Sequence, residues 1–350
     1  MEETSRRIMG GLFGLESPSQ SELPAAELAP PFLASPRIDL ANGRGAFPLL
    51  CEFLKPETVW LPSYLCSVVV DALSTSPVEL RFYPVDERLR LSDDRWLRDV
   101  TAGDIVIFID YFGFDQWSSV GAEAHRRGAW IVEDACQALL NDTFSEHADY
   151  VIFSPRKFIG VPDGGIVTSY SGATLPQATL PQAPLRWWLK SLEASCLRAS
   201  FDECGGSRIW FERFREAEAT APTATAQMSE LTTRLLQMRI DYTNRALRRR
   251  ENYHILSEAL ADLALLPSPG PSTVPLGFPI ILSDRRRVLE ALYAEQIYPA
   301  VHWAIDGCVP TEFDASHQLS RTIATLPCDH RYGEAEMQRM ALLVRRHIRA

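Results

Sequence analysis

The sequence predicts an α/β fold in which helices cover both faces of a mostly parallel central sheet, followed by a smaller C-terminal α+β domain. Between residues 42 and 169, short apolar segments alternate with helical patterns, as in proteins whose strands run parallel. These segments are apolar throughout, which indicates strands buried on both faces. Beyond residue 245, amphipathic helices accompany a short apolar strand.

The first half of the chain supplies the expected sheet. A glycine turn opens a helix at 42–54, and serine caps with a closing glycine mark a helix at 118–128. A short helix at 93–100 carries aspartate near its start, where the helix dipole favours negative charge. Another helix is expected at 64–74. Strands are expected at 58–62, 78–85, 105–114, 130–134, 149–154 and 164–169.

The second half is mostly helical. Residues 187–201 and 208–218 form amphipathic patterns with large aromatic side chains, which are typical of core or subunit packing. Residues 228–260 carry a helical pattern that is too long for one ordinary globular helix, so we expect it to link two domains. The remaining elements are a strand at 274–282 and helices at 285–296 and 334–348.

Three parts are expected along the chain. Residues 1–40 have little periodicity and many Ser, Pro and Glu residues, which predicts an arm lying over the body. Residues 41–245 form the large domain and residues 246–350 the small one. Within the large domain, residues 173–184 (ATLPQATLPQAP) repeat a pentapeptide in tandem, and this composition predicts a surface loop.

The composition and net charge argue against several classes of function. The chain has 350 residues and a formal net charge of −10, which argues against a nucleic-acid-binding surface. The seven cysteines are scattered without CxxC spacing, which favours free thiols in a reducing cytoplasm, and no metal site is expected. No segment approaches the roughly 18 consecutive apolar residues of a membrane span, so no membrane partner is expected.

The segment VIFSPRKFIGVPDGGI at 151–166 places a lysine where an apolar strand ends. Open α/β sheets bind ligands beyond the carboxyl ends of their strands, and Lys157 is expected there. A lysine partly removed from water can attack a carbonyl and form a Schiff base. Most lysines lie in solvent, so Lys157 alone leaves both interpretations open.

Asp134 ends the preceding expected strand. A Schiff-base lysine and an acid that keeps a pyridine nitrogen protonated are the pair that a pyridoxal phosphate enzyme requires. The adjacent Glu133 points the opposite way if the strand continues through it. Gln137, three residues after Asp134, is expected near the same ring. Asp134 could otherwise be a strand-end carboxylate in water.

Two segments are candidates for holding a phosphate. The glycines of NGRGAF at 42–47 open a helix, and the backbone N–H groups and dipole of such a helix start attract a phosphate. Ser154 offers a hydroxyl to the same group, unless it bonds to its own backbone. The chain thus carries the phosphate-binding turn at 42–47, then Asp134, then Lys157. This order indicates a pyridoxal phosphate site far more specifically than any one of the three features alone.

These segments resemble the DegT/DnrJ/EryC1/StrS family of fold-type I pyridoxal-phosphate aminotransferases, and most closely its shorter, divergent members. The resemblance covers nearly the whole chain. It rests on NGRGAF, LPSYLC, GDIVIFIDYFGF, IVEDACQA, DYVIFSPRKFIGVPDGG, IYPAVHW and LPCDHRYGEAEM. It implies a homodimer that binds pyridoxal 5'-phosphate.

The resemblance also implies a role for each matched residue. Lys157 would be the Schiff-base lysine and Asp134 the partner of the ring nitrogen, and these two would be catalytic. Gln137 would lie against the ring, and Ser154 would help to hold the phosphate. The implied cofactor-binding residues are Gly43, Arg44, Tyr64, Cys66, Asp134, Gln137, Ser154 and Lys157.

The chain departs from the family pattern in three places. The spacing between Ser154 and Lys157 is shorter than the usual family spacing between the phosphate serine and the lysine. Cys66 stands where many members have an aromatic side chain stacked on the ring, and Tyr64 could take over that face. Residues 220–231 (TAPTATAQMSEL) lack the asparagine that in many members reaches the cofactor of the neighbouring subunit.

Two further residues are candidates for substrate contacts. Tyr111 follows Asp110 at the end of a central strand and could line the pocket, although strand-end polar residues are often only structural. His302 corresponds to a family position near the substrate mouth, although a His-Trp pair after a strand is more often packing.

The expected activity is transfer of an amino group from an amino-acid donor, with glutamate as a candidate, to a keto substrate. By resemblance the acceptor would be a nucleotide-linked keto sugar in polysaccharide or natural-product biosynthesis. The alternatives are another pyridoxal phosphate reaction, such as a lyase or decarboxylase, and a non-catalytic accessory protein of the same fold. An unrelated α/β enzyme would need another nucleotide motif, but the sequence contains no GxGxxG and no GxxxxGK[ST].

Overall fold

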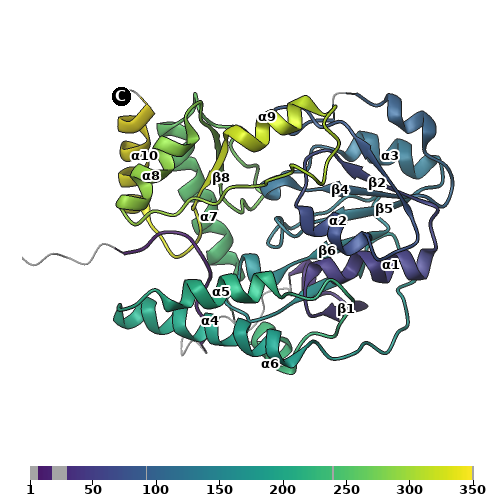
Figure 1. The fold of residues 1–350 in the computed structure, drawn as a ribbon, viewed down its shortest axis with the longest axis horizontal. Coiled ribbons are helices and arrows are strands. Elements are labelled where there is room, and N and C mark those ends of the chain that lie inside the picture. Colours follow the sequence, from purple (N-terminus) through teal and green to yellow (C-terminus); the bar gives the residue numbers. More distant parts are fainter. Residues whose placement is uncertain (1–6, 18–29, 92, 239, 349–350) are drawn as a thin grey trace, which may run out of the picture.

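The computed structural model describes residues 7–17, 30–91, 93–238 and 240–348. Among them, a seven-stranded sheet with the order β1-β7-β6-β5-β4-β2-β3 forms the centre of the molecule (Figure 1). Strands β2 to β6 run parallel, whereas β7 is antiparallel to β6 and β1 is antiparallel to β7. The mostly parallel sheet predicted from the sequence is therefore confirmed.

The elements have the following bounds. The strands are β1 (Arg37–Leu40), β2 (Thr58–Pro62), β3 (Glu79–Tyr83), β4 (Ile105–Ile109), β5 (Trp130–Asp134), β6 (Tyr150–Phe153), β7 (Gly165–Ser169), β8 (Phe278–Ile281) and β9 (Ile323–Leu326). The α-helices are α1 (Ala46–Leu54), α2 (Ser67–Leu73), α3 (Ser118–Arg126), α4 (Leu185–Cys204), α5 (Ile209–Ala219), α6 (Glu230–Leu236), α7 (Tyr242–Ala259), α8 (Arg285–Ala294), α9 (Asp314–Thr322) and α10 (Glu334–Ile348).

Strands β2, β4 and β6 are buried along their whole length. Their side chains on both faces enter one hydrophobic core, in agreement with the apolar pattern of these segments. In Figure 1, α4 and α5 lie side by side below the sheet, whereas α8 and α10 lie with β8 in the C-terminal part. There β8 and β9 pair antiparallel in a separate two-stranded sheet.

The N-terminal arm is only partly as expected. The sequence predicts residues 37–40 as part of this arm, but they form β1, an edge strand of the central sheet, because they pair in register with β7. Residues 7–17 do lie over the body. Met9 exchanges backbone hydrogen bonds with Gln296 and Tyr298, and the backbone N–H of Glu16 donates to the carbonyl of Gly160 at 2.7 Å. Residues 1–6 and 18–29 of the expected arm lie outside the described residues.

The long helical pattern at 228–260 breaks into α6 and α7. Ser229 accepts a hydrogen bond from the backbone N–H of Thr232, and Asp241 accepts one from that of Asn244, so each helix begins at its own cap. Helix α7 packs against α10 and β8. The division of the chain into domains at residue 245 stays a prediction.

Other differences are local. The strand expected at 105–114 ends at Ile109 and is followed by a 3₁₀ turn at Tyr111–Gly113. Helix α9 and strand β9 were not predicted. Residues 173–181 form neither helix nor strand. Within the described chain, no helix is both long and apolar enough to cross a membrane.

Candidate active site

A cavity of about 190 Å³ opens at the carboxyl ends of the parallel strands. It brings together residues from the turn before α1, from the end of β5, from the turn after β6, from α5 and from the segment before α9. The predicted site residues that line it are Gly43, Arg44, Cys66, Asp134, Gln137, Ser154, Lys157 and His302. Tyr64 and Tyr111 are not among the lining residues.

Lys157 reaches the cavity from a 3₁₀ turn that directly follows β6. Ser154 leaves the strand in an extended conformation, and the turn Pro155–Lys157 begins with a proline that fixes its own φ angle. The backbone N–H of Lys157 donates to the carbonyl of Ser154 at 3.2 Å. The Lys157 side chain itself is exposed in the single chain.

Asp134 is the last residue of β5, the neighbour of β6 in the sheet. Its side chain is buried, and Oδ1 accepts the backbone N–H of Cys136 at 3.0 Å. This bond fixes the orientation of the carboxylate. Because β5 and β6 run parallel, Asp134 and Lys157 come from the same edge of the sheet.

Gln137 is buried, and only the oxygen of its side-chain amide takes part in a hydrogen bond. Oε1 accepts the backbone N–H of Phe112 at 2.7 Å. Nε2 is buried and has no hydrogen-bond partner among the described residues. A buried donor without a partner costs free energy, so the cavity is suited to a ligand that offers an acceptor to Gln137.

The turn before α1 needs glycine for packing reasons. A Cβ atom on Gly43 would lie 3.0 Å from Sγ of Cys136. The side chain of Asn42 accepts the backbone N–H of Gly45 at 3.0 Å, which shapes the turn. A Cβ atom on Gly165 in β7 would lie 2.2 Å from the backbone carbon of Asn42. The turn is thus pressed against the sheet, with its backbone at the cavity.

Tyr64 and Tyr111 lie behind the cavity wall. The hydroxyl of Tyr64 donates to the carbonyl of His302, and the hydroxyl of Tyr111 donates to the carbonyl of Tyr64. Both rings pack near Trp303, with centroid distances of 5.5 and 6.3 Å. Of the two candidates for facing a cofactor ring, Cys66 lines the cavity, and burial raises the pKa of its thiol.

His302 lines the cavity as a neutral imidazole. Nδ1 lies 2.9 Å from the hydroxyl oxygen of Thr325. Burial, and then the nearby charge of Lys157, lower the pKa of His302 to about 3. Asp110 does not line the cavity of Lys157. It accepts Nε1–H of Trp117 at 2.9 Å and lines a different cavity together with Glu133.

The sequence analysis missed two charged residues of the cavity, Arg156 and Glu218. The guanidinium of Arg156 donates to the carboxylate of Glu218, and Arg44 lies 3.6 Å from the same carboxylate. Burial works to raise the pKa of Glu218, but the charges of Arg156, Arg44 and Lys157 lower it overall. Arg156 could have been found from its place beside Lys157, whereas nothing in the sequence distinguishes Glu218 from other helix-surface glutamates.

Known proteins resemble this chain in sequence pattern and in fold. A model of the DegT/DnrJ/EryC1/StrS aminotransferase family matches residues 101–345. The chain belongs to this family. Among the DegT/DnrJ/EryC1/StrS aminotransferases pyridoxal phosphate is the cofactor, so the chain is a pyridoxal-phosphate-dependent aminotransferase. No match was found among curated proteins.

Solved structures share the fold at low sequence identity. A DegT/DnrJ/EryC1/StrS aminotransferase from Brucella abortus is 16% identical with a TM-score of 0.63, and the match covers 89% of this chain and 86% of that one. PseC of Helicobacter pylori is 13% identical with a TM-score of 0.64, over 89% and 86%. TlmJ of Streptoalloteichus hindustanus is 16% identical with a TM-score of 0.64, over the same shares. These matches confirm the predicted fold class.

The residues of the cavity fit pyridoxal phosphate. Gln137 has an unpartnered donor for an oxygen on the ring. The space beside Gly43 is too narrow for a side chain and leaves the backbone at the start of a helix accessible to a phosphate. Asp134 supplies a fixed carboxylate and Lys157 an amine at the same cavity.

Proposed function

We propose that this aminotransferase moves an amino group from glutamate to the keto group of a nucleotide-linked sugar. Two structural neighbours support the sugar acceptor. PseC of Helicobacter pylori is an aminotransferase involved in the biosynthesis of pseudoaminic acid, and DesI was solved in the presence of its TDP-sugar product. The family assignment favours amino transfer over a lyase, a decarboxylase or a non-catalytic accessory protein.

The observation that carries the proposal is the shared cavity of Lys157 and Asp134. Bound pyridoxal phosphate supplies an electron sink that stabilises negative charge on an amino-acid carbon. Lys157 would hold the cofactor through its amine and, when free, would take the proton from the carbon that carries the donor's amino group. Asp134 would keep the proton on the ring nitrogen. Gln137 would donate from Nε2 to the ring oxygen, and Ser154 with the amides of Gly43 and Arg44 would hold the phosphate.

Helix α4 offers a surface on which a second copy of the chain could bind. Leu185 and Leu189 are 66% and 49% exposed and lie one turn apart on α4, and neighbouring exposed apolar side chains mark surfaces that bind another protein. We expect a homodimer in solution, measured by sedimentation equilibrium, with Leu189→Glu shifting it towards monomer. The seven free cysteines favour a reducing compartment such as the cytoplasm.

The chain has only three lysines, Lys55, Lys157 and Lys190, so the attachment point can be tested directly. Borohydride reduction of the protein with pyridoxal phosphate, followed by peptide mass spectrometry, should place the pyridoxyl group on Lys157. Transfer of ¹⁵N from labelled glutamate to a nucleotide-linked keto sugar should be lost in Lys157→Ala and retained in Lys190→Ala. Label on Lys55 or Lys190, or transfer by Lys157→Ala, would overturn the proposal.

A further inference from the structure

Two arginines of the described chain lie almost completely inside the protein, and they differ in what balances their charge. Arg198 on α4 and Arg249 on α7 are each 1% exposed. Arg198 is paired with Asp202 at 2.9 Å. Arg249 forms no ion pair within the described part of the chain, because the nearest acting carboxylate, Asp329, is itself paired with Arg331 at 2.8 Å.

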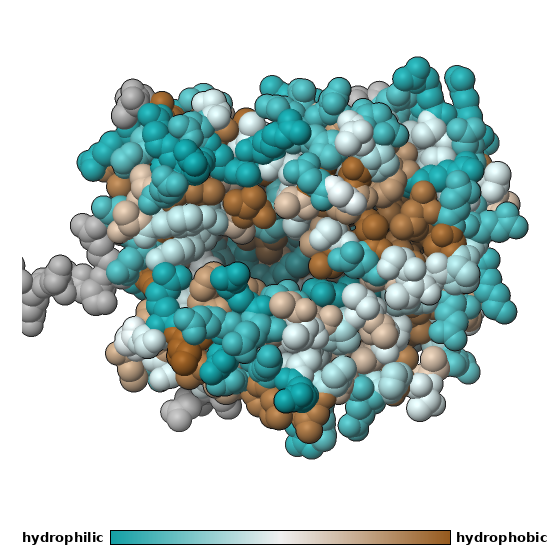
Figure 2. All heavy atoms as spheres, in the orientation of Figure 1, coloured by the Kyte–Doolittle hydropathy of each residue, from teal (hydrophilic) through white to brown (hydrophobic). Residues whose placement is uncertain are grey.

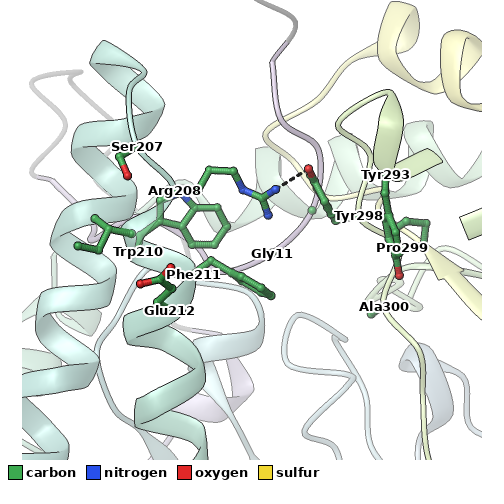
Figure 3. Close-up of a pocket in the computed structure, with 12 residues that line it drawn as sticks. Gly11, Ser207, Arg208, Trp210, Phe211, Glu212, Tyr293, Tyr298, Pro299 and Ala300 are labelled. Atoms are coloured by element: carbon green, nitrogen blue, oxygen red, sulfur yellow. Dashed lines mark hydrogen bonds between the residues drawn. The ribbon is translucent and has the colours of Figure 1, made fainter. Parts of the chain in front are cut away.

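Bulk water does not balance the charge of Arg249 either. Arg208, by comparison, is only partly buried, at a cavity of about 830 Å³ between the start of α5 and the segment 298–300 (Figure 3). Figure 2 shows the surface hollowed above α4 and α5. Arg249 lies away from any such opening, and its Nε has no hydrogen-bond partner among the described residues. A buried cation costs free energy that an apolar side chain of similar size does not, so the charge is expected to have a use.

The guanidinium of Arg249 lies over the ring of Phe158, the residue that follows Lys157. Its central carbon is 4.4 Å from the ring centroid, and the ring is completely buried. An aromatic face attracts a cation within about 6 Å, and most strongly where water is excluded. Burial lowers the pKa of Arg249 to about 10, so the group stays charged at pH 7. The contact therefore joins α7 to the turn of the Schiff-base lysine.

Two backbone carbonyls anchor the guanidinium. Nη1 of Arg249 donates to the carbonyls of Pro275 and Leu276, each at 3.1 Å. The backbone N–H of Leu276 donates to the carbonyl of Phe112 at 3.0 Å, and the N–H of Phe112 donates to Gln137. The carbonyls that hold the guanidinium thus belong to a segment bonded to the wall of the candidate active site.

Lys157 depends on its turn for its position. Its side chain is exposed in the single chain, so side-chain packing does not fix it. The backbone N–H of Phe158 donates to the carbonyl of Pro155 at 2.9 Å and closes the turn. Because the Cα atoms of consecutive residues are about 3.8 Å apart, a shift of Phe158 is passed on to Lys157. Misplacement of a reacting group by about 1 Å can cost a factor of about 100 in rate.

We propose that Arg249 is a positioning residue of the active site. Its guanidinium, anchored to two backbone carbonyls, holds the ring of Phe158 and thereby the turn that presents the amine of Lys157 to the cofactor. Arg249 does not line the cavity of Lys157, so it acts through Phe158. This inference rests on the proposed function, which assigns Lys157 as the attachment point of pyridoxal phosphate.

The test compares two forms of the cofactor in equilibrium binding to the full chain, measured by fluorescence quenching. The aldehyde of pyridoxal phosphate condenses with the amine of Lys157 and releases water, whereas pyridoxamine phosphate has no aldehyde. Arg249→Met should weaken binding of pyridoxal phosphate about tenfold or more and leave that of pyridoxamine phosphate unchanged. Arg249→Lys keeps the charge without the planar fork and should recover part of the loss. The control is Arg248→Met, at an exposed position paired with Glu251, which should change neither affinity.

A double-variant cycle separates positioning from a general loss of structure. Lys157→Ala cannot bond to the cofactor, so the addition of Arg249→Met should weaken binding of pyridoxal phosphate no further. If Arg249→Met fails to fold by circular dichroism, Phe158→Leu should show the same selective loss. Equal weakening of both cofactor forms, or unchanged binding of pyridoxal phosphate by Phe158→Leu, would overturn the inference.

The site of the pyridoxyl label keeps this inference apart from the proposed function. In the unaltered protein, label on a lysine other than Lys157 would overturn the proposed function and this inference with it. Label on Lys157, together with unchanged affinity of Arg249→Met for pyridoxal phosphate, would overturn the role of Arg249 alone.

Discussion

Arg156 donates to the carboxylate of Glu218 across 62 positions of the chain. The pair joins the turn that carries Lys157 to helix α5, and Arg44 at the start of α1 approaches the same carboxylate. One carboxylate on a helix of the second half of the chain therefore holds two cations of the candidate active site.

Replacement of Glu218 by Gln should destabilise the fold modestly. The side chain is 34% exposed, so solvent screening limits the loss to about 1 kcal/mol of unfolding free energy at pH 7. The pKa of Glu218 is lowered in the folded state, so the stabilisation is present above its unfolded pKa of about 4.3 and is lost as the pH falls through the folded pKa. Urea unfolding at pH 7 and pH 3.5 measures this, with the exposed Glu258→Gln as control. An equal loss at both pH values would contradict the assigned charge pair.

Asp110 and Glu133 form a buried pair of carboxyl groups next to the candidate site. Burial raises the pKa of Asp110 to about 7, and burial together with Asp110 raises that of Glu133. Because the folded state retains a proton that the unfolded chain has released, the unfolding free energy should fall as the pH rises from about 4 to about 7. Asp110→Asn should remove most of this loss and gain roughly 1–3 kcal/mol at pH 8. Asp94→Asn, at an exposed position, should gain nothing, and a pH profile unchanged by Asp110→Asn would refute the shared proton.

His302 should stay neutral at every pH at which the enzyme works. Its folded pKa of about 3 lies below the value of about 6.5 in an unfolded chain, so acidification below pH 6.5 favours unfolding. The ring signals of His302, assigned by comparison with His302→Asn, should not shift between pH 5 and pH 8 in the NMR spectrum of histidine-labelled protein. The same signals should titrate normally in urea. A native titration midpoint near 6 would show that the ring is not buried as described.

Gly160 has no room for a side chain. A Cβ atom there would lie 1.7 Å from the carbonyl oxygen of Gly14. Gly160→Ala should therefore push the segment 7–17 away and lower the unfolding free energy by about 1–3 kcal/mol. Gly270→Ala, where a Cβ atom meets open space, is the matched control in urea unfolding. If the two variants had equal free energies of unfolding, the segment 7–17 would move away from residue 160 without loss of stability, and the prediction would be wrong.

Most of the sheet could be predicted because its signals are local. The apolar segment that becomes β4 and the strand ends at Asp134 and Ser154 can be read from the chain itself. The edge strand β1 could not, because Arg37–Leu40 is short and gains its structure from pairing with β7. The sequence does not reveal helix α9 because Leu319 is the only large apolar side chain on its buried face.

The residues of the candidate site also fall into those that the local sequence predicts and those that only the tertiary fold brings together. Lys157 and Asp134 stand out because parallel strands deliver both to one edge of the sheet. Glu218 comes from α5, and only the tertiary fold brings this helix to the cavity of Lys157. Tyr64 was a candidate by its spacing from Cys66, but its hydroxyl donates to the carbonyl of His302 and turns the ring into the wall.

Residues 7–17 cross from the loop after Lys157 to the strand-like segment before His302, with bonds at Gly160, Gln296 and Tyr298. The segment thus joins parts of the chain that are far apart in sequence, around Gly160 on one side and Gln296 on the other. Without residues 7–17, the loop after Lys157 and the segment before His302 would lose the backbone hydrogen bonds that join both to one strand of chain.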